Sequence, residues 1–215
     1  MTFWEYLSSR REQLLLETWM HASAVLQCML LATLVGVLVG TLTYRSDRGG
    51  QLAVASTASV LTVPSFALLG LLIPLLGLGV APTVTALTLY GLLPVVRNTI
   101  VGLRGVDPAL VDAARGIGMP RPAVLLRVEL PLAWPAILTG IRVSTQMLMG
   151  VAAIAAYVSG PGLGNQIFHG LSRLGSANAI NAALAGTLAI AVLALLFDAA
   201  YVLIGRLTTS RGIRV

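Results

Sequence analysis

The chain has 215 residues, of which 57% are apolar and 10% charged, whereas about 25% of an ordinary soluble domain is charged. A soluble fold of this size lacks the polar residues to cover so much apolar surface, which excludes a soluble enzyme and a disordered chain. A single cysteine, Cys28, excludes a disulfide scaffold. The composition therefore predicts an all-α membrane protein with several transmembrane helices.

Five apolar segments are long enough to cross the membrane, because about 20 helical residues cover about 30 Å of hydrocarbon. Pro64 and Pro74 interrupt the second segment, and Pro94 lies inside the third. We expect Pro131 and Pro135 to break the chain before the fourth. The predicted spans are 22–44, 52–76, 83–101, 132–158 and 180–203.

Arginine distribution predicts the orientation of these spans. The basic residues are all arginine and give a net charge of +6. With segment 104–131 in the cytoplasm, eleven of the fourteen arginines lie inside or at the inner boundary, as the positive-inside rule requires. The N-terminus is then outside and the C-terminus cytoplasmic. The positive charge is thus explained by topology, and no nucleic-acid partner is expected.

The two ends of the chain lie outside the predicted transmembrane domain, residues 21–205. Residues 1–20 combine aromatic and charged side chains and lack the basic start and cleavage site of a secretory signal. This segment fits either a helix lying in the membrane interface or a solvated tail. Residues 206–215 are expected to form a cytoplasmic tail.

Segment 104–131 is too long and too patterned for a simple connection between spans. Asp107 and Pro108 predict a helix start, with a capping carboxylate followed by a proline that needs no N–H partner. Gly116 and Gly118 predict its end, since glycine tolerates the left-handed conformation after a last turn. The small and apolar residues of this helix share one face by helical spacing. They are Leu110, Ala113, Ala114 and Ile117.

A second short helix is predicted from Pro122 to Glu129. Two short amphipathic helices at the cytoplasmic surface fit a plug for a groove in another protein. They fit equally well a re-entrant hairpin packed on its own bundle.

The same segment resembles the EAA motif of ABC importer permeases, which reads Glu-Ala-Ala, three residues, Gly, nine residues, Ile, one residue, Leu-Pro. Here Asp112-Ala113-Ala114 precedes Gly118 by three residues, and Val128-Glu129-Leu130-Pro131 follows after nine. Asp replaces Glu and Val replaces Ile. The resemblance implies a type I ABC importer permease fold whose cytoplasmic coupling helix sits in a cleft of the ATPase subunit. The implied coupling residues are Leu110, Asp112, Ala113, Ala114, Arg115, Gly118 and Met119.

Four further stretches resemble the permeases for glycine betaine, carnitine, choline and related osmoprotectants. They are TVPSFALLGLLIPLLGLG (62–79), LYGLLPVVRNTIVGLRGVDPAL (89–110), GIGM (116–119) and SGPGLGNQIFHGL (159–171). Permeases for methionine and other amino acids share the EAA segment and the five-span layout, which leaves an amino-acid solute as the alternative. An ATP-independent channel or secondary carrier is a second alternative, but carriers typically have several intramembrane carboxylates and this chain offers one.

Catalytic motifs are absent from the sequence. Without lysine, the chain has no phosphate-binding glycine-rich loop with its Lys. His21, Cys28 and His169 are too scattered to predict a metal site. We therefore expect a non-catalytic subunit that binds no cofactor or metal.

The resemblance implies that this chain spans the plasma membrane of a prokaryote several times and that the other parts of the transporter are separate chains. An ATP-binding cassette subunit would hold ATP and Mg. A second copy of this permease, or a homologous one, and an extracytoplasmic solute-binding protein would complete the assembly.

Polar residues inside the spans are candidates for the translocation path. Those expected there are Ser65, Tyr90, Thr145 and Gln146, with Thr85 and Ser144 beside them. Asp198 lies inside the fifth span, where a carboxylate is costly. Pairing with Arg206 or with an arginine of another helix is one interpretation, and a proton or cation site is the other. Arg142 is expected to mark the inner end of the fourth span.

Two further motifs have alternative interpretations. Gly36 and Gly40 form a GxxxG pattern that allows close helix approach, either within one subunit or at a dimer seam. His169, with Asn165 and Gln166, fits a contact with a docked binding protein or a solvated outer loop.

Overall fold

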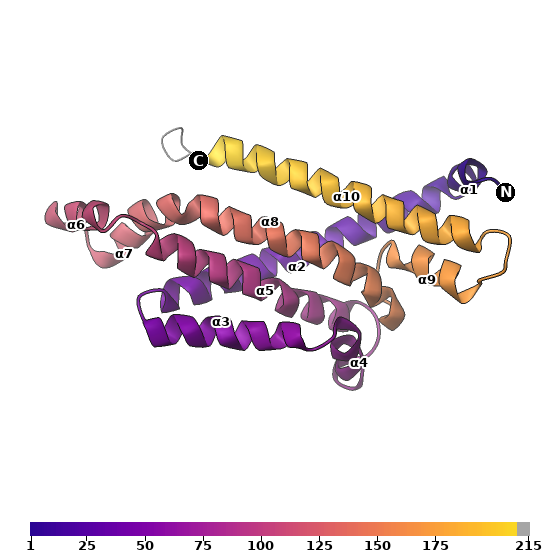
Figure 1. Ribbon diagram of the computed structural model, residues 1–215, viewed down its shortest axis with the longest axis horizontal. Helices are drawn as coiled ribbons and strands as arrows, with labels where there is room; N and C mark the ends of the chain where they lie inside the picture. Colours follow the sequence, from indigo (N-terminus) through magenta and orange to yellow (C-terminus); the bar gives the residue numbers. More distant parts are fainter. Residues whose placement is uncertain (210–215) are drawn as a thin grey trace.

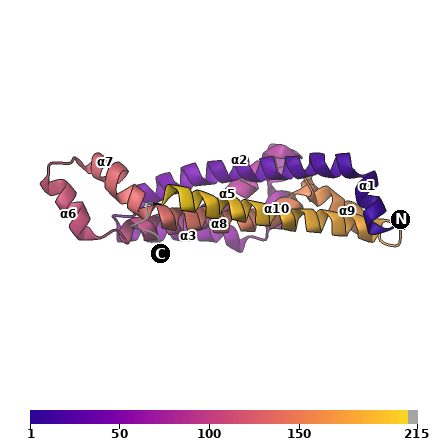
Figure 2. The same ribbon diagram turned by 90° about the horizontal axis from the view of Figure 1, so that it is seen from above.

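A computed structural model describes residues 1–209, and the regular elements in that part of the chain are helices (Figure 1). The long helices run roughly side by side, and short helices gather at the two ends of the molecule (Figures 1 and 2). In chain order the elements are α1 (Phe3–Ser9), α2 (Arg11–Thr43), α3 (Asp47–Thr62), α4 (Ser65–Leu76), α5 (Val80–Arg104), α6 (Pro108–Gly116), α7 (Arg121–Val124), the π-helix η1 (Leu125–Glu129), α8 (Leu130–Ile154), the 3-10 helix η2 (Ala155–Val158), α9 (Gly164–Ser172) and α10 (Ala179–Thr208).

The predicted count of about five spans is confirmed. Within residues 1–209, four helices are long and apolar enough to cross a membrane: α2, α5, the helix of residues 121–158 and α10. The pair α3 and α4 makes the fifth if it is taken as one span, although it is bent by 92°. The first four residues of the predicted tail, 206–209, belong to the end of α10 and its cap, and the rest of the tail lies outside the described residues.

The bend between α3 and α4 has a local cause in the sequence. Val63 is extended, with ψ of 126°, because the ring of the following proline disfavours the helical conformation. Pro64 then caps α4, and Pro74 is accommodated inside it. The predicted span 52–76 is therefore two helices that meet at nearly a right angle.

The predicted break at Pro131 and Pro135 is wrong, because the helix runs through both residues. The π-helix η1 lies directly before them, and the Leu130 N–H bonds to the Leu125 carbonyl five residues back. This wider turn gives the Pro131 ring room that a regular α-helical turn does not. The long helix thus starts in the segment after α6, which puts Arg142 midway along α8 rather than at its inner end.

Small residues bring α2, α5 and α8 into close contact. A Cβ added at Gly36 would lie 2.7 Å from Val95 Cγ1, and one at Gly40 would lie 2.6 Å from Thr99 Cγ2. The GxxxG pair therefore packs α2 on α5 within this subunit. Gly140 of α8 is equally constrained, since its Cβ would lie 2.6 Å from the Pro94 carbonyl oxygen. Glycine at these contacts gives the bundle a tightly packed centre around α5.

Candidate functional site

Helix α6 is shaped by its own sequence at both ends. Asp107 Oδ1 accepts a hydrogen bond from the Ala109 N–H at 2.9 Å, and Pro108 occupies the first turn. At the other end Gly118 has φ of +87°. The N–H of Gly118 bonds to Arg115 O at 2.9 Å and that of Met119 to Ala114 O at 3.1 Å. This pair of bonds is a Schellman motif, so the predicted start and end of the helix are confirmed.

Most of the predicted coupling residues face away from the rest of the molecule. Figures 1 and 2 show α6 at one extreme end of the structure, with α7 beside it. Ala114 is buried and Met119 half-buried, whereas Leu110 is 48% exposed and Ile117 81% exposed. Ala113, Asp112, Arg115 and Gly118 are exposed too. An exposed helix with apolar side chains fits a surface that a partner covers better than a hairpin packed on its own bundle.

The base of this cytoplasmic segment is tied to the turn between α2 and α3. On one side Arg104 Nε donates to Tyr44 O at 2.8 Å, and Arg104 Nη2 lies 3.1 Å from Asp47 Oδ1. On the other side the buried Glu129 Oε2 accepts from Tyr44 Oη at 2.8 Å and from Arg45 Nη2 at 3.1 Å. The turn therefore contacts both ends of the segment that carries α6.

Sequence reasoning missed this tie, which we call the base clamp (Tyr44, Arg45 and Glu129). Glu129 was visible only as part of the EAA-like pattern. A carboxylate directly before an apolar span was the available signal, because such a group needs a partner when it is buried. Its partners come from residues about 85 positions away, which spacing along the chain does not reveal.

The predicted path residues occupy different environments. Tyr90 is buried and its hydroxyl donates to Val63 O. Thr145 is also buried, with Oγ1 2.9 Å from both Ile141 O and Tyr201 Oη. Ser65 is half-buried at the start of α4, and Gln146 is exposed. In this conformation Gln146 is the most accessible of the four, and their contact with a solute stays a prediction.

Thr85 and Ser144 are the other two residues predicted to line the path. Of the companions of the path residues, Ser144 donates to Gly91 O at 2.8 Å and Thr85 to Ala81 O at 2.9 Å. Both hydroxyls thus donate to backbone carbonyls. The Ser144 bond joins α8 to α5, and the Thr85 bond lies within α5.

An ion pair joins the middle of α8 to α10. Arg142 Nη2 lies 2.6 Å from Asp198 Oδ2, and Arg142 Nε bonds to the other carboxylate oxygen. Gln146 Nε2 donates to Ala194 O at 3.1 Å and lies 3.4 Å from Asp198 Oδ1. Asp198 therefore pairs with an arginine of another helix, which was the first of the two interpretations. A paired charge is the form in which an intramembrane carboxylate is best tolerated.

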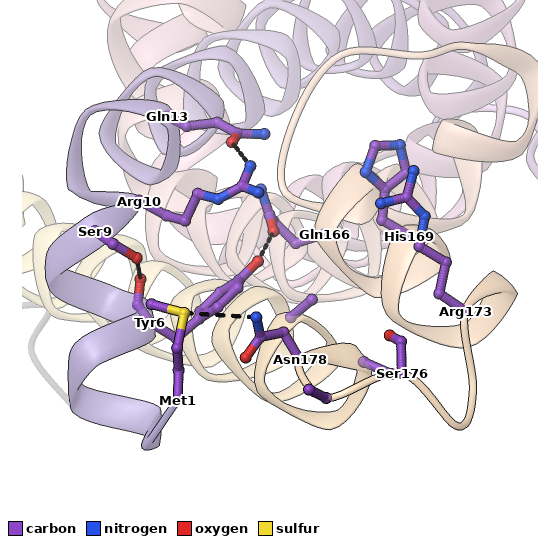
Figure 3. A pocket seen from close by; sticks show the side chains of 13 residues that line it. Met1, Tyr6, Ser9, Arg10, Gln13, Gln166, His169, Arg173, Ser176 and Asn178 are labelled. Carbon is purple, nitrogen blue, oxygen red and sulfur yellow. Dashed lines mark hydrogen bonds between the residues drawn. The ribbon is translucent and has the colours of Figure 1, made fainter.

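At the end opposite α6, a polar pocket of about 470 Å³ lies between the first two helices and α9 (Figure 3). Tyr6 and Arg10 enter it from one side, and His169 and Arg173 from the other. Tyr6 Oη donates to Gln166 Oε1 at 2.8 Å in a buried bond that ties α1 to α9. The two arginines make this pocket basic.

The three residues predicted in the outer loop have separate roles. Gln166 is buried, and its side-chain oxygen accepts the hydrogen bond from Tyr6. Asn165 Nδ2 donates to Gly162 O at 2.9 Å and fixes the turn before α9. His169 lines the pocket and is exposed, so it alone of the three is available to a partner.

Comparisons with known proteins agree with this architecture. The model of a family described as binding-protein-dependent transport system inner membrane component matches residues 32–210. The choline transport system permease protein OpuBB of Bacillus subtilis is 40% identical over 168 residues, covering 78% of this chain and 77% of that protein. The osmoprotectant import permease protein OsmW of Salmonella typhimurium is 40% identical over 202 residues, covering 92% of each.

Among solved structures, an inward-facing form of the MetNI methionine ABC transporter superposes with a TM-score of 0.81. The match covers 94% of this chain and 99% of that chain at 21% identity. At this identity the likeness shows a shared type I importer permease fold and carries no argument about the solute.

Proposed function

The chain belongs to the family of binding-protein-dependent transport system inner membrane components, and from that premise we propose that it imports small quaternary-ammonium osmoprotectants. Its relatives are named as permeases for choline, carnitine, glycine betaine or osmoprotectants. Two of these are at least 35% identical over more than nine tenths of this chain. The proposed solutes are glycine betaine, carnitine, choline and proline betaine.

The observation that carries the proposal is the exposed α6. On its face of small and apolar residues Ala114 is buried, but Leu110, Ala113 and Ile117 are exposed within residues 1–209. Its ends are fixed by a side-chain cap and a Schellman motif. A preformed helix of this kind binds a groove with little loss of conformational freedom. We assign the groove to a separate ATP-binding cassette subunit, which holds the ATP and Mg. This chain itself contributes no catalytic group and binds no cofactor.

The base clamp gives a route by which motion of α6 reaches the spans. The segment continues through η1 into α8 without a break, and Glu129 ties that junction to the end of α2 through Tyr44. Closure of two ATPase subunits would move α6, and α2 and α8 would move with it. Alternating access then exposes the path outward on ATP binding and inward after hydrolysis.

The basic pocket at the opposite end supports docking of a solute-binding protein. Arg10, His169 and Arg173 lie around one hollow, and an acidic side chain of the partner would complement them. This assignment places the N-terminus outside and the C-terminus in the cytoplasm, because α10 runs from the pocket toward the end that carries α6 (Figure 1). That polarity agrees with the arginine distribution.

Transport requires a second permease subunit, identical or homologous. Within residues 1–209 the bundle is closely packed around α5, where a Cβ added at Gly36, Gly40 or Gly140 would lie less than 3 Å from a neighbouring atom. We place the path at the seam between two such subunits.

The test is uptake of labelled glycine betaine into proteoliposomes that contain this chain, its neighbouring permease, the ATPase subunit and the binding protein. Accumulation that needs both ATP inside and binding protein outside supports the proposal. If the ATPase is stimulated by a binding protein but no betaine, carnitine or choline enters, the solute class is wrong and an amino acid becomes the candidate. Uptake that is indifferent to ATP overturns the coupling itself and favours a channel or secondary carrier.

A further inference from the structure

The cluster of Arg142, Gln146 and Asp198 has no part in the coupling described above. Arg142 lies at the middle of α8, and its partner lies on α10. Both charges remain accessible in this subunit: the Arg142 side chain is 45% exposed and that of Asp198 30% exposed. An ion pair at this depth is only partly shielded by its own chain.

The surroundings of the cluster differ from the other exposed surfaces of the long helices. Beyond its first turn, the exposed positions of α8 recur at helical spacing and are mostly polar or small; they are Thr139, Arg142, Val143, Gln146 and Gly150. On α10 the exposed positions next to the cluster are apolar, as at Leu195 and Leu196. On α2 they are apolar as well, as at Leu34 and Leu38.

Lipid favours an apolar surface, and charges inside a membrane protein face a protein interior or a water-filled cavity. The exposed faces of α2 and α10 therefore suit contact with lipid. The α8 stripe suits the seam between two permease subunits, which is where the proposed function places the path. Figure 2 shows α2 along the edge of the bundle opposite α8. The α8 stripe therefore lies apart from the exposed face of α2, and it borders that of α10 at the Arg142–Asp198 pair.

The geometry of the pair leaves hydrogen-bonding capacity for a ligand. Arg142 engages Asp198 through Nε and Nη2, and within residues 1–209 no partner bonds to its Nη1. A guanidinium offers five N–H donors in a planar fork and binds carboxylates well. Beside it, the Asp198 carboxylate presents negative charge on the same exposed side.

We propose that the Arg142–Asp198 pair is a transient binding site for zwitterionic solutes in the translocation path. The solute lies side-on to the pair, with its carboxylate on Arg142 Nη1 and its quaternary ammonium beside Asp198. The existing ion pair does not have to open. Glycine betaine and carnitine carry both charges, whereas choline carries only the cation. This inference rests on the proposed function, because it assumes solutes of that class.

The experiment compares uptake of glycine betaine and choline in the complete reconstituted transporter, with saturating binding protein loaded with each solute. In Arg142→Gln the ratio of betaine to choline uptake is expected to fall at least about fivefold, since a charged hydrogen bond to the carboxylate is lost. In Asp198→Asn uptake of both solutes is expected to fall. Arg97→Gln, at an exposed arginine of α5, is the matched control and leaves the ratio unchanged.

Because Arg142→Gln leaves Asp198 without its partner, Arg142→Lys provides a second test that keeps the charge. It loses the planar fork, and the ratio is expected to fall in the same direction by a smaller factor. Equal loss of both solutes in Arg142→Gln and Arg142→Lys would show a purely structural pair and overturn the inference. A wild-type transporter that carries neither solute would instead overturn the proposed function.

Discussion

The two ends of the bundle are built in opposite ways. At the end that carries the basic pocket, the backbone is packed so closely that a Cβ at Gly164 would lie 2.1 Å from the Ala153 carbonyl oxygen. At the other end, a Cβ at Gly116 or Gly118 would meet nothing within 4 Å. Tertiary contacts fix the first end, whereas the two ends of α6 at the second are shaped by local capping. The difference agrees with the proposed docking of a partner on the α6 end.

The largest expected effect comes from disturbing the packed end. Gly164→Ala forces a methyl group against the Ala153 backbone, which cannot move as a flexible side chain does. We expect a loss of about 3 kcal/mol of stability, the upper end of what overpacking usually costs. Thermal unfolding of the purified subunit in detergent measures this loss. A Gly164→Ala protein as stable as the wild type would contradict the described packing.

The next largest effect is expected at the base clamp, which ties the segment that carries α6 to the turn after α2. Glu129→Ala removes the buried acceptor of Tyr44 and Arg45. We expect a loss of about 1–3 kcal/mol and ATPase activity that no longer depends on the binding protein. Tyr44→Phe removes the hydroxyl that donates to Glu129 and accepts from Arg45 Nε, but it keeps the bond between Arg45 Nη2 and Glu129, so its effect on both measurements is expected to be smaller. Full coupling in Glu129→Ala would show that the clamp is only structural.

At the α6 end, Gly116 and Gly118 are equally uncrowded but differ in backbone conformation, so substitutions at the two positions can be compared. Gly118→Val puts a side chain at a φ of +87°, which costs about 1–2 kcal/mol locally and unwinds the Schellman motif. We expect ATP-driven uptake to fall while the thermal stability of the bundle stays close to that of the wild type. Gly116→Ala, inside the helix and equally uncrowded, is expected to transport normally. Equal uptake by the two variants would contradict a coupling role for the capped end of α6.

The smallest effect is expected in the basic pocket. Arg10→Ala removes one charge and its bond to Gln13, and exposed charges contribute about 1 kcal/mol or less. The binding-protein concentration for half-maximal ATPase stimulation is expected to rise about two- to fivefold, in line with that energy. The difference between variant and wild type should shrink as salt is raised, since exposed charges are screened. A difference that does not change with salt would exclude electrostatic docking there.

The parts of the fold that the sequence predicts are those with local causes. Asp107, Pro108 and Gly118 specify α6 through interactions within a few residues, and hydropathy specifies the long helices. Pro64 also acts locally, on the residue before it. These elements agree with the structure because no distant contact is needed to form them.

The parts that the sequence does not predict depend on tertiary contacts or on unusual turns. The π-helix before Pro131 lets the helix continue where proline normally stops one. Tyr90 and Thr145 are polar inside spans, but their hydroxyls bond to Val63 O and to Tyr201 Oη, which are distant along the chain. Asp198 required a partner, and only the register of α10 against α8 selects Arg142.

Docking of the ATPase subunit on α6 would protect this helix from chemical labelling. Cys28 is buried and is the only native cysteine, so Ile117→Cys adds one accessible thiol on the α6 segment, at a position that is 81% exposed. We predict rapid labelling by a maleimide when the permease is alone and strong protection when the ATPase subunit is bound. Leu174→Cys, at a position 71% exposed near the opposite end, should label equally in both states. Equal labelling of Ile117→Cys with and without the ATPase subunit would contradict its docking on α6.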